Sequence, residues 1–153
     1  MEIPVGNWRM PVWPDGYLGS ISHADGLCVA HVARRTDLLG VGVDVERANA
    51  LSPDMCDQVS SPDEWKRLSR GQTPQIDAGT LCFSAKEAVY KAYFPAAQAF
   101  LEFTDVHLQV DWESGTFAAS LSADEKPSVA GRRLFEGRFA QVDGYIAAAV
   151  WIA

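Results

Sequence analysis

Two carboxylates lie two positions apart in the segment 42–46, whose sequence is GVDVE. If this segment is a strand, Asp44 and Glu46 project from the same face, roughly 7 Å apart along the backbone. Like charges placed in this way repel each other, and a hard divalent cation between them would remove that repulsion. The alternative that the pattern leaves open is a strand face in contact with solvent, where an arginine pairs with the carboxylates.

A second charged group occupies the segment 83–92, whose apolar spacing is helical. Glu87 and Lys91 are four positions apart and lie on one helix face, where such a pair stabilises a helix by about 0.3–0.5 kcal/mol. Ser84 and Glu87 also fit a capping box at a helix start. The functional alternative makes Glu87 a third oxygen ligand of the cation, with Lys86 and Lys91 as partners of a phosphate group.

The segment 19–23, with the sequence GSISH, is a third candidate. Its Ser22–His23 step, at the end of a strand, is most often a turn that carries a surface histidine. The same step could present a hydroxyl and an imidazole to a phosphate group. His31 and His107 fall inside strand patterns, so we expect both to be structural.

The strands that position these candidates follow from the hydrophobic pattern. The valines of the segment 40–46 point to one face, and Gly42, Asp44 and Glu46 point to the other. The Asp-Gly pairs at 25–26 and 143–144 are typical of tight turns between paired strands. Alternating apolar residues predict strands at 17–22, 27–35, 40–46, 106–110, 116–121, 135–142 and 145–152.

Two helices are expected between these strands. The first has Ser61 as its N-cap, Pro62 in its first turn and Glu64 at the capping-box position, and it runs to about Arg70. The order of strands, then helices, then strands predicts an α+β fold, with an antiparallel sheet packed with helices.

The second helix follows a polar loop over 71–79 that includes Pro74. It begins at Ser84 and ends before Pro95, because a proline does not continue a helix. Its apolar stripe is Ala85, Ala88, Val89, Ala92 and Tyr93, and its other side carries Lys86, Glu87, Tyr90 and Lys91.

Composition and charge limit the classes of function. The chain has 153 residues, which suits a single domain. Its 48% hydrophobic and 22% charged residues are those of a globular protein, not of a disordered, collagen-like or coiled-coil chain. A net charge of −7 without a basic tract disfavours binding to nucleic acid or to a membrane surface.

Cysteine usage and apolar runs bear on the compartment. The chain has an odd number of cysteines, and none of them forms a CxxC pair, so we expect free thiols in a reducing compartment. The three are Cys28, Cys56 and Cys82. The first eleven residues lack the charged start and apolar run of a secretory signal. No stretch approaches the roughly 20 apolar residues of a membrane span. These features predict a cytoplasmic protein.

Taken in order, the motifs resemble those of the 4′-phosphopantetheinyl transferase superfamily, and within it the two-lobed Sfp-like kind in its enterobactin-synthase branch. The matching text is PVWPDG at 11–16 running into GSISH at 19–23, then GVDVER at 42–47 and FSAKEAVYKAYFP at 83–95. The segment 61–68 and the closing strands are also similar. Each motif is weak alone, but their order and spacing match over nearly the whole chain.

The resemblance implies the fold of this family, with one lobe complete over 41–153 and the remainder of the first lobe over 1–40. Members of this branch carry a further N-terminal stretch, which completes the first lobe and supplies basic contacts to the coenzyme. This chain begins just before the segment 9–14. We therefore expect either weak coenzyme binding or a site completed by self-association or by a neighbouring segment.

The resemblance also implies an activity. Enzymes of this family transfer the phosphopantetheine arm of coenzyme A to a serine of an apo acyl or peptidyl carrier protein, use Mg²⁺ and release 3′,5′-ADP. Asp44, Glu46 and Glu87 match the family's metal carboxylates. Glu87 also matches the candidate base, which acts on the serine directly or through a metal-bound water.

The remaining residues match contacts to the coenzyme. Lys91, which we expect to be catalytic together with Glu87, matches the lysine at the pyrophosphate, and Lys86 matches the other lysine of the motif. Ser22 and His23 match residues that hold the adenosine phosphates. Arg9 lies near the place of a basic coenzyme contact.

Two other functions are weighed against this one. A metal-dependent nuclease also clusters Asp, Glu and Lys, but the acidic net charge and the lack of a basic groove argue against it. A non-catalytic module that docks carrier proteins or assembles a larger synthase would not need Asp44, Glu46, Glu87 and Lys91 together. We expect a role in secondary metabolism, but the sequence does not distinguish polyketide, non-ribosomal peptide and fatty-acid carriers.

Overall fold

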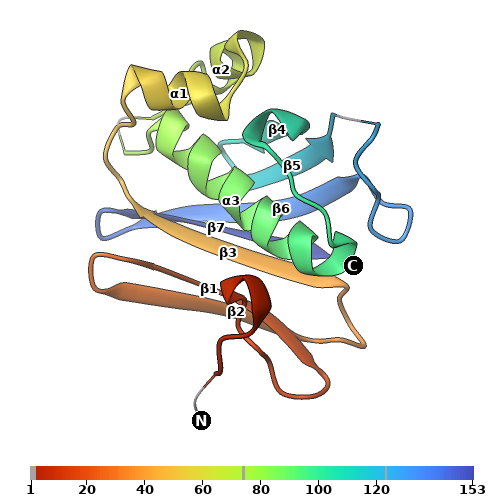
Figure 1. The fold of residues 1–153 in the computed structure, drawn as a ribbon. Helices are drawn as coiled ribbons and strands as arrows, with labels where there is room; N and C mark the ends of the chain where they lie inside the picture. The colour runs from red at the N-terminus through yellow and green to blue at the C-terminus, as the bar shows by residue number, and fades with distance from the viewer. Residues whose placement is uncertain (1–2, 74, 123) are drawn as a thin grey trace.

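Two antiparallel sheets and one long helix form the architecture of the computed structural model, which describes residues 3–73, 75–122 and 124–153. The smaller sheet pairs β1 (Tyr17–Ala24) with β2 (Leu27–Arg34), and the larger sheet has the strand order β3–β7–β6–β5–β4. β1 lies beside β3, and α3 crosses one face of the larger sheet (Figure 1). The α+β class with an antiparallel sheet is confirmed. The larger sheet consists of β3 (Gly40–Arg47), β4 (Val106–Asp111), β5 (Thr116–Leu121), β6 (Leu134–Val142) and β7 (Tyr145–Ile152).

Both predicted Asp-Gly turns are present. Asp25 and Gly26 have φ angles of 41° and 90°, and Asp143 and Gly144 have φ angles of 50° and 78°. Positive φ at both central residues defines the two-residue hairpin turn whose twist matches that of paired strands. The β1–β2 and β6–β7 hairpins are therefore specified locally by these two residue pairs.

Helix α3 (Ala78–Ala97) begins earlier than the sequence predicts. Its N-cap is Asp77, whose carboxylate accepts a hydrogen bond of 2.8 Å from the backbone N–H of Thr80. Ser84 is buried in the middle of the helix, so the capping-box interpretation of Ser84 was wrong. The extra turns bury Leu81 and Cys82 in the core, and this packing favours helix over the loop that was expected.

The same helix also ends later than predicted, because Pro95 lies inside it. A proline lacks the N–H that would bond to the carbonyl four residues earlier, and its ring crowds that carbonyl, but neither effect prevents the last two residues from keeping helical backbone angles. The helix ends at Ala97. Gln98, with φ 52°, then forms the C-cap and donates its N–H to the Phe94 carbonyl at 2.8 Å.

Two short helices lie beyond the N-terminal part of α3 (Figure 1). Both α1 (Pro53–Val59) and α2 (Pro62–Leu68) begin with a capping serine followed by a proline. The helix α2 was predicted and ends at Leu68 rather than at Arg70, whereas α1 was missed although Ser52 supplies the same signal. Pro74, which we expected in the following loop, lies outside the described residues.

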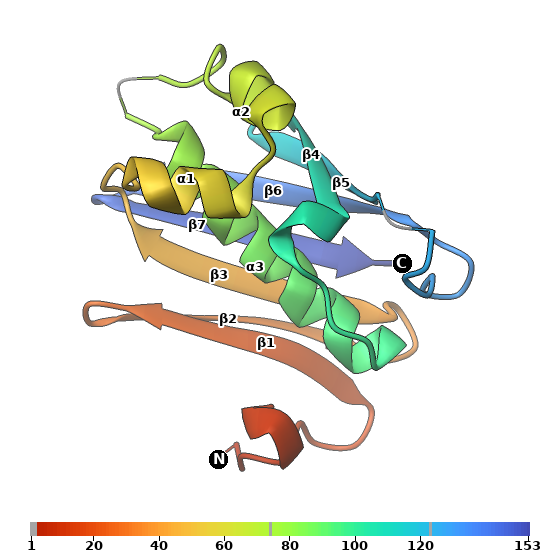
Figure 2. The same ribbon diagram turned by 45° about the horizontal axis from the view of Figure 1, so that its top comes forward.

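The helix α3 packs closely on β3, as Figure 2 shows. A Cβ atom at Gly42 would clash with the carbonyl oxygen of Ala88, so only glycine lets the two backbones approach this closely. The face of β3 that carries Gly42, Asp44 and Glu46 is therefore covered by the helix over part of its length, and Asp44 is only 3% exposed. The predicted apolar stripe is confirmed as buried: Ala85, Ala88, Val89, Ala92 and Tyr93.

Side-chain hydroxyls of β1 join the two sheets along the edge of β3 that faces away from β7. The backbone N–H of Val43 donates to Ser20 Oγ at 3.0 Å, and that of Val45 donates to Ser22 Oγ at 3.3 Å. These two bonds satisfy donors on the side of β3 away from β7, where no strand of the described part of the chain is paired with it. They also bring Ser22 next to the carboxylates of β3.

The structure bears on the predictions of free thiols and of no membrane-spanning segment. All three cysteines are free thiols, of which Cys82 is buried and Cys28 is exposed. No helix within the described ranges has both the length and the apolar character that crossing a bilayer requires.

Candidate active site

Three elements meet at a junction formed by Ser22 of β1, Asp44 of β3 and Lys91 of α3. Lys91 Nζ donates to Asp44 Oδ1 at 2.6 Å, to Ser22 Oγ at 3.2 Å and to the Val43 carbonyl at 3.3 Å. Ser22 Oγ in turn donates to Asp44 Oδ1 at 3.0 Å. Lys91 thus pairs with Asp44 across the helix–sheet contact rather than with Glu87 on its own helix.

The second oxygen of the Asp44 carboxylate has a different environment. Asp44 Oδ2 is buried and has no hydrogen-bond partner among the described residues. A buried polar atom without a partner is uncommon and destabilising. Asp44 Oδ2 is therefore the atom at this junction that most needs a cation or a donor from a bound molecule.

The negative charge of Asp44 also affects the pKa values of two further carboxylates. Burial raises the pKa of Glu46 above its ordinary value, and the negative charge of Asp44 raises it further. Burial is also the largest cause of the raised pKa of Glu87, again followed by the charge of Asp44. Lys91 lowers both pKa values without cancelling the rise, so the three carboxylates carry more negative charge than this lysine neutralises.

The metal prediction can be tested against this arrangement. Within the described residues, no three side chains of the His, Cys, Asp and Glu types are grouped as a metal site. The donor set still fits a magnesium ion, since Mg²⁺ binds carboxylate oxygens and completes its octahedral shell with water and substrate phosphates. The unpartnered Asp44 Oδ2 supplies the free ligand atom that such a site requires.

Lys86, which we expected as a partner of a phosphate group on the side of the helix opposite the apolar stripe, has an enclosed ammonium. It is only 2% exposed, and its ammonium donates to Glu64 Oε2 at 2.7 Å, to the Val59 carbonyl at 2.8 Å and to the Phe103 carbonyl at 2.9 Å. An ammonium has three donors, and all three are engaged inside the protein. Lys86 is therefore not positioned to bind the phosphate that we predicted for it.

Glu64 explains why Lys86 is buried. Its other carboxylate oxygen accepts a hydrogen bond of 2.7 Å from the backbone N–H of Leu108 in β4. Ser61 caps α2 through the N–H of Glu64 as predicted, but the Glu64 side chain binds Lys86 and β4 instead of completing a capping box. The capping-box interpretation of Glu64 was wrong because a buried cation competes for its carboxylate.

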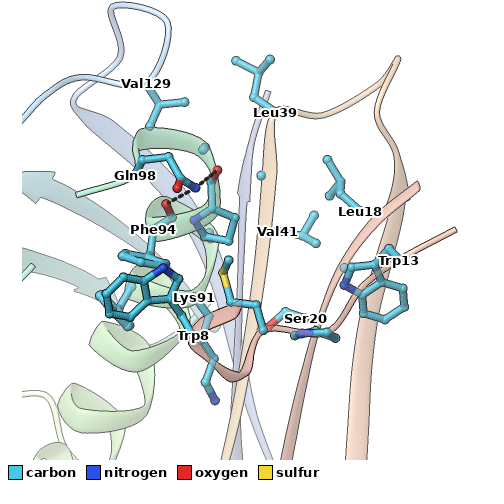
Figure 3. Close-up of a pocket in the computed structure, with 18 of the residues that line it drawn as sticks. Trp8, Trp13, Leu18, Ser20, Leu39, Val41, Lys91, Phe94, Gln98 and Val129 are labelled. Carbon is cyan, nitrogen blue, oxygen red and sulfur yellow. Dashed lines mark hydrogen bonds between the residues drawn. The ribbon is translucent and has the colours of Figure 1, made fainter. Parts of the chain in front are cut away.

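A cleft of about 880 Å³ opens beside the junction. Its walls are the N-terminal segment with η1 (Asn7–Arg9), β1, the start of β3 and the C-terminal half of α3 (Figure 3). Arg9, Arg35 and Lys91 line it, so Lys91 belongs both to the cleft and to the junction. Sequence reasoning missed Arg35, which has no motif around it and reaches the cleft only through the β1–β2 pairing.

His23 lies apart from this group. It is exposed and, by the alternation of the strand, projects from the face of β1 opposite to Ser22. Ser20 was also missed as a functional position, although the spacing of the two serines in the segment 19–23 carried the signal. Both serines face β3, where one hydroxyl binds the strand and the other also binds Asp44.

A second cavity, of about 480 Å³, lies along the other side of α3. Glu87 and Tyr90 line it together with Phe103 of η2 (Phe103–Asp105) and the neighbouring loop. Tyr90 lines both cavities. Glu87 and Lys91, one helical turn apart, thus face two different openings in the surface.

Two family models match the chain. The model described as "4′-phosphopantetheinyl transferase superfamily" matches residues 40–150, and the model described as "4′-phosphopantetheinyl transferase N-terminal domain" matches residues 1–33. The boundary between the two matches falls at the connection from β2 to β3.

Several curated proteins are similar in sequence. The 4′-phosphopantetheinyl transferase Svp of Streptomyces mobaraensis is 40% identical over 97% of this chain and 61% of its own length. The 4′-phosphopantetheinyl transferase Npt of Nocardia iowensis is 33% identical over 98% of this chain and 71% of its own. Enterobactin synthase component D of Salmonella typhi is 41% identical over 58% of this chain and 37% of its own. The chain thus spans less than two thirds of the length of the first of these relatives.

A solved structure with a similar fold is the holo-[acyl-carrier-protein] synthase of Thermotoga maritima. The match has a TM-score of 0.57 and 20% sequence identity, and it covers 75% of this chain and 63% of the other. This similarity supports the predicted fold and, at that identity, nothing finer.

Proposed function

The chain belongs to the 4′-phosphopantetheinyl transferase superfamily, and from this premise we propose that it transfers the phosphopantetheine arm of coenzyme A to a serine of an apo acyl or peptidyl carrier protein. The observation that carries the proposal is the junction of Lys91, Asp44 and Ser22 at the edge of the cleft. The names of the similar proteins Svp and Npt support the same activity. Residues 1–40 and 41–153 would then form parts of two lobes on either side of the coenzyme.

The cleft has the size and lining that a nucleotide requires. Its volume of about 880 Å³ lies within the roughly 300–1,000 Å³ of typical ligand sites. Arg9, Arg35 and Lys91 offer positive charge to phosphate groups, and aromatic side chains offer apolar surface to the base. Lys91 would bind the pyrophosphate because it alone of the three also contacts the carboxylate junction.

Asp44, Glu46 and Glu87 would hold a magnesium ion together with the pyrophosphate. When bound, the ion would neutralise the charge that develops on the departing phosphate. The raised pKa values of Glu46 and Glu87 support a site built for a cation, because each carboxylate is destabilised in its charged form when no cation is near.

Glu87 would act as the general base. The serine oxygen attacks the phosphorus of the phosphopantetheine arm, the P–O bond to the nucleotide breaks, and its electron pair leaves with 3′,5′-ADP. Glu87 accepts the proton of the serine hydroxyl. Its raised pKa makes it a better proton acceptor than an ordinary glutamate, and the second cavity beside it offers the serine an approach.

The test is transfer to a small panel of apo acyl and peptidyl carrier proteins, with coenzyme A and Mg²⁺, followed by intact mass. We expect at least one carrier to gain the mass of one phosphopantetheine arm, and Glu87→Gln to lower turnover by roughly 10²- to 10⁴-fold while it retains coenzyme binding. A carrier that binds without gaining mass would instead support a docking module. Sedimentation of the same sample tests whether self-association completes the site.

A further inference from the structure

The N-terminal segment 4–12 forms a small hairpin that stands over the cleft. The Val12 N–H donates to the Pro4 carbonyl at 2.8 Å, and the Gly6 N–H donates to the Met10 carbonyl at 2.8 Å. Its tip is η1, which contains Trp8 and Arg9. A two-stranded hairpin is at best marginally stable alone, so its contacts with the rest of the protein contribute to where it lies.

The tip has an unusual backbone. Trp8 and Arg9 have φ angles of 58° and 59°, the left-handed conformation that glycine or asparagine normally supplies. Two consecutive bulky residues in this conformation are strained and persist only when other interactions hold them. The Met10 N–H closes the turn with a bond of 3.1 Å to the Asn7 carbonyl, so the hairpin requires these angles, and the two bulky residues strain it unless other contacts compensate.

The indole of Trp8 provides that interaction. The centroid of its ring lies 5.9 Å from the ring centroid of Phe100 and 6.4 Å from that of Phe94, in edge-to-face geometry with both. Those two rings lie 4.9 Å apart and also contact Tyr90, so Trp8 docks on an aromatic cluster at the C-terminal half of α3. Trp8 is still 71% exposed, so only part of the indole is in contact with the cluster and most of the side chain is not buried.

This contact spans the cleft opening. Trp8 lies beside Phe94 on the α3 side of the cavity, whereas Trp13 and Leu18 lie on the opposite side (Figure 3). The hairpin thus starts from the β1 side and reaches the α3 side. Releasing Trp8 would free the tip, with Arg9, from the helix that carries Lys91.

We propose that Trp8 is a positioning residue that clasps the hairpin 4–12 onto α3 and so retains coenzyme A in the cleft. The inference rests on the proposed function and adds the feature that controls how fast the coenzyme leaves. A contact that is mostly exposed and maintained against backbone strain is suited to open and close, because little apolar surface is lost when it opens.

The experiment measures the dissociation rate of coenzyme A, in the presence of Mg²⁺, from the unchanged chain and from W8A, W8F and V5A. Each edge-to-face contact is worth roughly a 2- to 10-fold change in an equilibrium constant. We expect W8A to release coenzyme A about 10-fold faster and to raise its KM more than it changes kcat. W8F, which keeps a ring at this position, should restore most of the retention. V5A is the matched control, since Val5 is 73% exposed on the same hairpin.

Two further variants separate the clasp from simple folding of the tip. Glycine accepts a positive φ without strain, so W8G removes the ring while it relaxes the turn, and it should release coenzyme A as fast as W8A. The effect of W8A should shrink in an F100A background, because the two rings act as a pair. Equal dissociation rates for the unchanged chain, W8A and W8G would overturn the clasp alone. Absence of coenzyme binding by the unchanged chain would overturn the proposed function and the clasp with it.

Discussion

Lys86 and Lys91 lie on the same helix, five positions apart, and each forms an ion pair with a carboxylate from another element. The Lys86–Glu64 pair is buried, with both side chains 1% exposed, and each group also binds backbone atoms. The Lys91–Asp44 pair is open on the lysine side, with side chains 27% and 4% exposed, and Asp44 Oδ2 has no partner among the described residues. The first region is closed and complete, whereas the second has both solvent access and an unused ligand atom.

This difference teaches how a structural ion pair and a candidate site can be told apart. A pair whose donors and acceptors are all engaged can stabilise the fold but has nothing left to offer a ligand. A pair beside a cleft, with a carboxylate oxygen left over, can exchange its contacts when substrate or cation binds. The four predictions below test this contrast.

The largest expected effect is on stability, for Glu64→Ala. Removing one partner of a buried pair leaves the Lys86 ammonium uncompensated, which costs about 3–5 kcal/mol in the free energy of unfolding. Denaturant titration measures it. The control is Arg47→Met, which breaks the exposed pair with Asp25 while leaving the Asp25-Gly26 turn unchanged, and it should cost no more than about 1 kcal/mol. Similar losses for the two variants would contradict the contrast.

For Asp44→Ala we expect the opposite result, a large loss of transfer activity with little loss of stability. Without Asp44 the site loses a cation ligand, and kcat should fall by at least about 100-fold. Lys91 retains the Val43 carbonyl, Ser22 and solvent, so the melting temperature should change little. Turnover and melting are measured on one sample. Near-normal turnover at saturating Mg²⁺ would remove Asp44 from the proposed mechanism.

Lys91→Met should weaken the binding of coenzyme A. One charge-assisted hydrogen bond to phosphate contributes about 1.5–3 kcal/mol, so the Kd should rise roughly 10- to 150-fold. Calorimetric titration of the folded variant measures this value. Lys66→Met, at an exposed position of α2, is the matched loss of one positive charge and should leave the Kd unchanged. Equal shifts for both variants would mean that only net charge matters.

The smallest effect is the pH dependence that Glu87 contributes to stability. Its pKa is raised in the folded state above the ordinary value of 4.5, so the folded protein holds the proton more tightly than the unfolded chain does. As the pH rises above 4.5, ionisation favours the unfolded chain, and stability falls across that window. Without divalent cation, the melting temperature of Glu87→Gln should therefore be higher than that of the unchanged protein at pH 7. Below pH 4.5 the two melting temperatures should be equal.

Melting curves between pH 4 and 7, with and without Mg²⁺, test this prediction. Mg²⁺ should raise the melting temperature of the unchanged protein more than that of Glu87→Gln, because the glutamine supplies no charge to the cation. If Glu87 served only as a helix partner of Lys91, the variant would melt below the unchanged protein at pH 7 instead.

Local signals in the sequence were sufficient for much of the fold. The period-2 pattern predicted the strands, and the Asp-Gly pairs predicted two hairpins, because both depend on neighbours along the chain. The ends of α3 were not predictable in this way. Asp77 and Ser84 are both good N-caps, and the choice between them came from the burial of Leu81 and Cys82 in a core made by distant strands.

The candidate site shows the same division. The sequence by itself identified the residue types and placed Asp44 and Glu46 on one strand face and Glu87 and Lys91 on one helix. It could not distinguish Lys86 from Lys91, since both are lysines of one charged motif. Their environments depend on partners 22 and 47 positions away, namely Glu64 and Asp44. Only the tertiary structure decides which ammonium is enclosed and which faces a cleft, because burial and electrostatic pairing are properties of the packed elements.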